Sequence, residues 1–104
     1  MTQLTRGLVF LHSHKHIHRD LKPGNIFIKL GEKQEVIVKI GDFGTVKKVG
    51  RTTQQTRTGT EEYIAPEVWN EDPYSYPCDI FSLGIILIRL AECFVPFDLL
   101  LLLW

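Results

Sequence analysis

The chain has 104 residues, which is room for one compact domain or for part of a larger one. Apolar residues make up 44% of it and charged residues 23%, and this balance excludes an intrinsically disordered protein. Twelve basic side chains match twelve acidic ones, so the bulk charge gives no support to nucleic-acid binding.

The first predicted element is a helix over residues 2–15, where leucines recur on one face at spacings of four and three: Leu4, Leu8 and Leu11. Residues 16–25 follow it with the sequence HIHRDLKPGN. Because Pro23 and Gly24 rule out a continuing helix, this segment is predicted to be a loop.

Two short strands are predicted next, over residues 26–30 and 36–40, with the polar residues 31–35 as a hairpin loop. Antiparallel pairing puts the outer ends of such strands side by side, with opposed residues roughly 5 Å apart. Those ends carry Asn25 and, after Gly41, Asp42. Their amide and carboxylate oxygens are ligands that Mg²⁺ prefers, so a shared magnesium site is predicted at the open end of the hairpin.

Residues 44–60 contain no apolar run and are predicted to form a polar loop, with five threonines and two arginines between residues 51 and 60. Residues 79–94 are the opposite, because they are apolar on nearly every face. A helix of that kind is typical of one buried on all sides within a larger domain.

The C-terminal stretch from residue 80 is very apolar, but charges at Arg89, Glu92 and Asp98 interrupt it and Pro96 would break a helix. A membrane span needs about 20 largely uncharged apolar residues, so no membrane association is expected.

Cys78 and Cys93 are far apart in the sequence and do not have metal-binding spacing. Reduced thiols are therefore favoured over the alternative of a disulfide. The N-terminus has neither the apolar region nor the cleavage site of a signal peptide, which together with the thiols favours a cytoplasmic location.

Three short motifs occur in a fixed order along the chain: His18-Arg19-Asp20-Leu21 with Asn25, then Asp42-Phe43-Gly44, then Ala65-Pro66-Glu67. They match the kinase patterns H-R-D-L-x-x-x-N, D-F-G and A-P-E. Each motif alone is weak evidence for a kinase. The three together are specific, because two predicted strands lie between the first two motifs and a threonine-rich loop lies between the last two. Over residues 2–97 the chain therefore resembles the eukaryotic serine/threonine protein kinase family.

The resemblance implies a catalytic role for three residues. Asp20 is implied to be the catalytic base, and Lys22 to lie near the transferred phosphoryl group and the nucleotide. Thr60 is implied to hydrogen-bond both side chains and to help define the substrate platform. Asn25 and Asp42 are implied to bind Mg²⁺ and the nucleotide, which makes ATP and Mg²⁺ the expected cofactors.

Regulation by phosphorylation is implied by Arg19, which directly precedes the expected base. Arginine can hold a phosphate through bidentate hydrogen bonds and so order a loop. Thr56 sits where the family's main phosphosite commonly lies, and three rivals remain open: Thr52, Thr53 and Thr58.

Four further residues match structural parts of the family. His18 and Phe43 are implied to belong to the hydrophobic stack that aligns the active enzyme. Asp79 is implied to accept backbone hydrogen bonds from the catalytic loop. Glu67 is implied to pair with an arginine of a later helix.

The implied fold is α+β: the mainly helical C-terminal lobe of the protein-kinase fold, incomplete, with a small β-hairpin. Residues 1–97 would form the partial kinase domain and residues 98–104 an atypical apolar tail. A glycine-rich loop and a strand lysine, which hold ATP in the family, have no counterpart in this sequence. The chain alone is therefore expected to be inactive and to need a missing N-terminal lobe or parent kinase chain.

The expected function is transfer of the ATP γ-phosphoryl group to serine or threonine of a protein substrate by the complete enzyme. Within the family, the strings NIFI, VKIGDFG and DIFSLGIIL are most similar to kinases of the alpha subunit of translation initiation factor 2. A general serine/threonine kinase is the rival subgroup. The competing class is a non-catalytic fragment that acts only as an interaction module or not at all.

Overall fold

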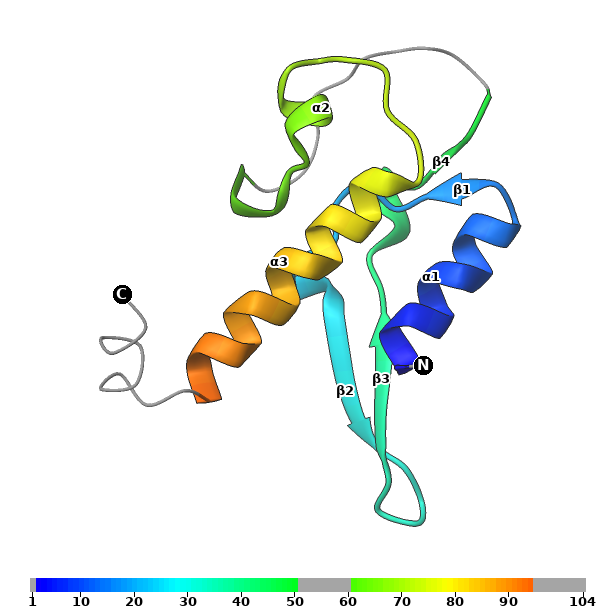
Figure 1. Cartoon of the computed structure of the whole chain (residues 1–104). Helices are drawn as coiled ribbons and strands as arrows, with labels where there is room; N and C mark the ends of the chain where they lie inside the picture. Colours follow the sequence, from blue (N-terminus) through cyan, green and yellow to red (C-terminus); the bar gives the residue numbers. More distant parts are fainter. Residues whose placement is uncertain (1, 51–60, 95–104) are drawn as a thin grey trace.

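The computed structural model of the protein describes residues 2–50 and 61–94. It has an α+β fold, in which helices accompany two small sheets of two strands each. The elements follow one another along the chain as α1 (Gln3–Ser13), β1 (His16–Ile17), η1 (Pro23–Asn25), β2 (Ile26–Leu30), β3 (Val36–Ile40), η2 (Phe43–Thr45), β4 (Lys47–Lys48), η3 (Glu61–Tyr63), α2 (Pro66–Trp69) and α3 (Pro77–Phe94) (Figure 1).

Helix α1 confirms the first predicted element, although it is shorter than residues 2–15 at both ends. Thr2 caps its start, where the side-chain oxygen accepts a hydrogen bond from the Thr5 amide at 3.2 Å. The helix ends at Ser13, and two residues later Lys15 has a φ of 60°, a left-handed conformation that no helix continues. Leu8 is the fully buried residue of its apolar face.

The predicted hairpin is confirmed with the same strand bounds, since β2 and β3 pair antiparallel from Ile26 opposite Ile40 to Leu30 opposite Val36. Gln3 ties α1 to the free edge of β3: its side-chain amide donates to the Val36 carbonyl at 2.8 Å and accepts from the Val38 amide at 2.7 Å. The hairpin is thereby fixed against the helix that precedes residues 18–25.

A second ribbon pairs β1 with β4, with His16 opposite Lys48 and Ile17 opposite Lys47. The sequence prediction of a featureless loop from residue 44 is therefore wrong at its beginning, where η2 and β4 lie. The strands of this ribbon have only two residues each, so they leave no periodic pattern that would predict them.

Two apolar clusters make up the core of the described chain. The first contains Leu8, Leu21, Leu83 and Ile86, and the second contains Ile17, Ala65, Val68 and Cys78. Burial of each large apolar side chain contributes roughly 1.5–3 kcal/mol. Because Ile17 belongs to one cluster and Leu21 to the other, the loop between them is anchored at both ends.

Helix α3 confirms the predicted long helix but begins at Pro77, two residues earlier than expected. It does not show the expected burial on every face. Leu83 and Ile86 are buried, whereas residues on the other faces are exposed: Ile80, Leu87, Ile88 and Leu90. Within the described residues, other elements pack against one side of this helix only (Figure 1). None of the helices in the described part of the chain is long and apolar enough to cross a bilayer.

Candidate active site

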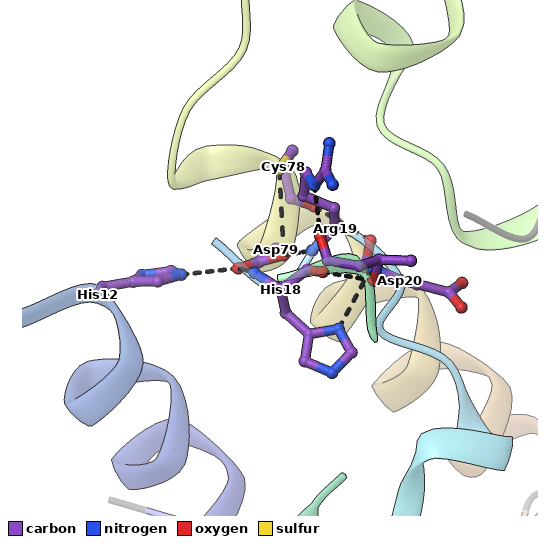
Figure 2. Close-up of polar contacts among 8 residues, drawn as sticks. His12, His18, Arg19, Asp20, Cys78 and Asp79 are labelled. Atoms are coloured by element: carbon purple, nitrogen blue, oxygen red, sulfur yellow. Dashed lines mark hydrogen bonds and ion pairs between the residues drawn. The ribbon is translucent and has the colours of Figure 1, made fainter. Parts of the chain in front are cut away.

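The segment from His18 to Asn25 is held by one buried carboxylate on α3. Asp79 is 1% exposed, and its two oxygens accept hydrogen bonds from the backbone amides of His18 and Arg19, both at 2.9 Å (Figure 2). Arg19 has a φ of 70°, a backbone conformation that residues other than glycine rarely adopt. The carboxylate therefore stabilises a strained backbone directly before Asp20.

His12 on α1 is a further partner of this carboxylate, and no role is predicted for it from the sequence. Its Nε2 donates to Asp79 Oδ2 at 2.8 Å (Figure 2). Its ring packs on that of Tyr76 with centroids 4.9 Å apart. One signal was available: His12 lies four residues after the buried Leu8, which places both on the same face of the helix.

The structure brings Asp20, Lys22 and Asn25 together. Lys22 Nζ lies 3.4 Å from Asp20 Oδ2, which places a cation beside the carboxylate. Asn25 is 4% exposed, and its Nδ2 donates to the Asp20 carbonyl at 2.7 Å and to Asp20 Oδ2 at 3.4 Å. The amide of Asn25 thus fixes the backbone of residue 20 from across the loop.

Asp42 stands at the same open end of the hairpin as Asn25, as the strand register predicts. The Gly41 amide donates to the Asn25 carbonyl at 2.9 Å, which extends the pairing by one step beyond β2 and β3. Asp42 follows with a φ of 55°, and its exposed carboxylate accepts a hydrogen bond from the Gly44 amide at 3.4 Å. Its role as a metal ligand stays a prediction.

Arg19 reaches away from Asp20 toward the segment that follows the D-F-G motif. Its Nε donates to the Thr45 carbonyl at 2.6 Å and its Nη1 to the Tyr74 hydroxyl at 3.1 Å. Thr45 in turn donates from its hydroxyl to the His18 carbonyl at 2.8 Å. The contact with Tyr74 joins positions 55 residues apart, and no sequence pattern predicts it.

The predicted threonines of the activation loop lie outside the described residues. This holds for Thr60, for Thr56 and for its rivals: Thr52, Thr53 and Thr58. The apolar tail over residues 98–104 lies outside them as well. The roles given to these positions remain predictions.

His18 and Phe43 approach each other, with ring centroids 5.8 Å apart and planes tilted by 59°. Phe43 is 56% exposed, so within the described residues this ring has a neighbour on one side and water on the other. His18 is fully buried, and its Nε2 lies 2.9 Å from the Gly41 carbonyl. Glu67 is half-buried on α2.

A family model described as the protein kinase domain matches residues 1–99 of the chain. The chain belongs to the protein kinase family. Curated relatives are serine/threonine kinases. An 84-residue stretch is 42% identical to eukaryotic translation initiation factor 2-alpha kinase 1 of Plasmodium falciparum, and spans 81% of this chain and 5% of that protein.

Two further relatives match over nearly the whole chain. It is 42% identical over 100 residues to the serine/threonine-protein kinase PLK1 of Xenopus laevis, which covers 94% of this kinase chain and 16% of PLK1. It is 38% identical over 98 residues to the serine/threonine-protein kinase Nek5 of Mus musculus, and the match covers 92% of this kinase chain and 15% of Nek5. This kinase chain therefore spans a small part of the length of each relative.

The two cysteines of the kinase chain are free thiols in different surroundings. Burial, and next the neighbouring Asp79 charge, raise the pKa of Cys78 from 9.0 to about 12, whereas Cys93 is exposed. Because the thiolate is the nucleophile, we expect iodoacetamide at about pH 8.5 to alkylate Cys93 and to leave Cys78 unmodified in the native chain. Mass spectrometry of the digested protein measures both sites, and equal labelling would contradict the buried, protonated thiol.

The raised pKa of Cys78 also makes the stability of the folded chain depend on pH. The pKa of Cys78 in the folded chain lies above its unfolded value, so the folded state holds the proton longer. Its contribution to stability is therefore fully present below about pH 9 and is lost as the pH rises toward about 12.

Proposed function

We propose that this chain supplies the catalytic loop and metal-binding residues of a serine/threonine protein kinase, as part of its C-terminal lobe. The reaction would be transfer of the ATP γ-phosphoryl group to a serine or threonine hydroxyl of a protein substrate. The observation that carries this proposal is the grouping of Asp20, Lys22 and Asn25, with Lys22 Nζ 3.4 Å and Asn25 Nδ2 3.4 Å from Asp20 Oδ2.

Asp20 has the chemistry of a general base in this arrangement. Its carboxylate would accept a hydrogen bond from the substrate hydroxyl, orient it for attack and take its proton as the new P–O bond forms. The nearby Lys22 ammonium would offset negative charge on the transferred group. Asn25 and Asp79 hold the backbone around Asp20, so the carboxylate needs no reorganisation during the reaction.

The donor set at the open end of the hairpin fits Mg²⁺ and the phosphates of ATP. Asn25 uses its Nδ2 toward Asp20, which leaves its amide oxygen as the acceptor, and Asp42 offers an exposed carboxylate. Oxygen ligands of this kind suit a small hard cation. When bound, Mg²⁺ would neutralise phosphate charge, and Asn25 and Asp42 would orient it.

The relatives support a serine/threonine kinase, and one of them is named for phosphorylation of translation initiation factor 2-alpha. We assign this chain to that subgroup as a proposal, with a general serine/threonine kinase as the rival. Because the chain spans between 5% and 16% of the lengths of these relatives, the activity is proposed for a complete kinase domain.

A second candidate is a non-catalytic interaction module. The observation that favours it is the exposed apolar side of α3 together with exposed residues of the hairpin: Ile80, Leu87, Ile88, Phe27 and Ile28. Apolar surface of this extent is typical of a protein that packs against other structure.

A chimera tests the two candidates. Residues 2–97 would replace the matching part of PLK1 from Xenopus laevis, and transfer of labelled phosphate from ATP to a serine peptide would be measured. The catalytic proposal expects Mg²⁺-dependent transfer. A folded chimera that binds Mg-ATP but transfers no phosphate would favour the non-catalytic module.

In the active chimera, an Asp42→Asn substitution removes the anionic oxygen offered to Mg²⁺. We expect at least about a tenfold loss of activity at low Mg²⁺ concentration, with partial recovery as Mg²⁺ is raised. The matched control is Glu32→Gln in the exposed hairpin loop, which removes one negative charge without touching the site. Equal Mg²⁺ dependence of Asp42→Asn and the unmodified chimera would contradict the metal-ligand role.

A further inference from the structure

One side of helix α3 presents uncharged residues that the described structure leaves largely exposed. They recur at the spacing of a single helix face and are named together as the α3 stripe: Ile80, Gly84, Leu87, Ile88 and Ala91. The three large side chains among them are 48–56% exposed, whereas Leu83 and Ile86 on the core side of the same helix are buried. An exposed apolar surface of this kind is typical of one that another segment covers.

Gly84 forms a notch in the α3 stripe. A Cβ atom added there would meet no atom within 4 Å beyond the adjacent turns of the helix itself. Glycine weakens a helix interior relative to alanine, and it is used where another segment approaches the backbone closely. Because no described segment makes that approach, the notch indicates that the covering segment lies outside the described residues.

The segment that follows α3 in the chain has the matching chemistry. The helix ends at Phe94, and Pro96 disfavours its continuation. No charged residue follows Asp98, since residues 99–104 are five leucines and a tryptophan. This segment, which lies outside the described part of the chain, is named here the leucine tail.

The leucine tail is long enough to reach the whole α3 stripe. Residues 95–98 form a connection of ordinary length for a chain that reverses after a helix. With a rise of about 1.5 Å per residue, Ile80 lies about 17 Å along the helix from Ala91. Six residues can span about 20 Å when extended. The tail could therefore run back from Ala91 to Ile80 without any further chain.

We propose that the leucine tail folds back along the α3 stripe and covers it. The leucines would bury Leu87 and Ile88, and the notch at Gly84 would admit one large side chain of the tail. A second copy of the chain is a less favoured occupant, because attachment to α3 gives the tail a high effective concentration at the stripe. The inference goes beyond the proposed kinase function and does not depend on it.

A docked tail would occupy part of the surface that the second candidate function uses. The α3 stripe includes three of the exposed apolar residues that favour an interaction module: Ile80, Leu87 and Ile88. A protein partner that binds this side of α3 would therefore have to displace the tail. The tail would thus act as a built-in competitor for that surface.

The emission of Trp104 tests the docking in the 104-residue chain. The chain has two tryptophans, so a Trp69→Phe background makes Trp104 the one fluorescent indole. We expect a blue-shifted emission that acrylamide quenches weakly. A Leu87→Glu, Ile88→Glu double substitution should lower the ratio of docked to released tail at least about tenfold for each carboxylate. Acrylamide should then quench Trp104 as strongly as it quenches a free tryptophan amide.

The matched control is a Val9→Glu, Val36→Glu double substitution, because both valines are 53% exposed and lie on other elements. It should keep Trp104 protected, and circular dichroism verifies that each variant is folded. Equal quenching of the two double variants would overturn the inference. Protection that rises with protein concentration would also overturn it, because it would assign the stripe to a second copy.

Cross-linking locates the tail without placing charges on α3. In a Cys93→Ser background, Ile88→Cys is combined with a cysteine at each leucine of residues 99–103 in turn. Arg89→Cys is the matched control, since it is one residue away and faces away from the stripe. At the best tail position we expect the disulfide with residue 88 to form at least about tenfold faster than that with residue 89.

A tail that moves freely would reach both cysteines equally often, so equal rates of disulfide formation at every tail position would overturn the inference. The cross-linking comparison decides alone if circular dichroism shows that the Leu87→Glu, Ile88→Glu chain is unfolded.

Discussion

An Asp20→Asn substitution in the PLK1 chimera is expected to lower the rate of phosphate transfer about 10³-fold, within the range usual for a lost general base. The asparagine has the same shape, so the backbone hydrogen bonds that hold this loop would persist. Its amide cannot take the proton of the substrate hydroxyl, and it no longer offers a charge to Lys22, 3.4 Å away. The turnover rate of a serine peptide at saturating ATP measures this effect.

The decrease should appear in kcat, with little change in KM, because substrate binding does not depend on the proton transfer. Asp72→Asn is the matched control, since it makes the same chemical change at an exposed position after α2. Its rate should stay within about twofold of the unmodified chimera. A rate for Asp20→Asn above about a tenth of the original would contradict the assignment of this residue as the base.

The elements with strong local patterns could be predicted from the sequence. The predicted strand bounds of the hairpin match the structure to the residue number, because apolar side chains recur on both sides of a polar loop. Its register then places Asn25 and Asp42 at one end, a consequence of strand pairing that needs no side-chain information. The long helix is predictable because residues 79–94 are a long apolar segment without proline.

Contacts between distant segments could not be predicted in the same way. The β1–β4 ribbon joins two pairs of residues about 30 positions apart, and neither pair carries a periodic signal. The hydrogen bond from Arg19 to the Tyr74 hydroxyl depends on how the chain between α2 and α3 returns to the proposed catalytic loop. The position of His12 on the buried face of α1 indicates that its side chain points inward. Its partner cannot be predicted in this way, because Asp79 on α3 lies 67 residues away in the sequence.

Asp79→Asn is expected to destabilise the chain by about 2–4 kcal/mol, the largest stability effect of any single polar substitution that we propose. Asp79 Oδ2 accepts from His12 Nε2 and the His18 amide, and Oδ1 accepts from the Arg19 amide. Asparagine has one oxygen, so its NH₂ group would face an N–H donor at one of these positions. Water cannot replace the lost acceptor, because the side chain is 1% exposed. Urea unfolding followed by circular dichroism measures the change in free energy.

Glu92→Gln is the matched control on the same helix, since this exposed carboxylate binds only the exposed Arg89 among the described residues, and no measurable loss is expected. His12→Ala removes one of the four donors, which include the Cys78 thiol, and leaves both backbone contacts, so its loss of stability should be smaller than that of Asp79→Asn. If both substitutions lowered the free energy of unfolding equally, the contribution of Asp79 would come from its hydrogen bond with His12 on α1 and not from those with the His18 and Arg19 amides. Asp79→Asn should also slow phosphate transfer in the chimera. The hydrogen bond from the Arg19 amide to Asp79 stabilises the left-handed backbone of Arg19, and weakening it would disturb the position of the adjacent Asp20.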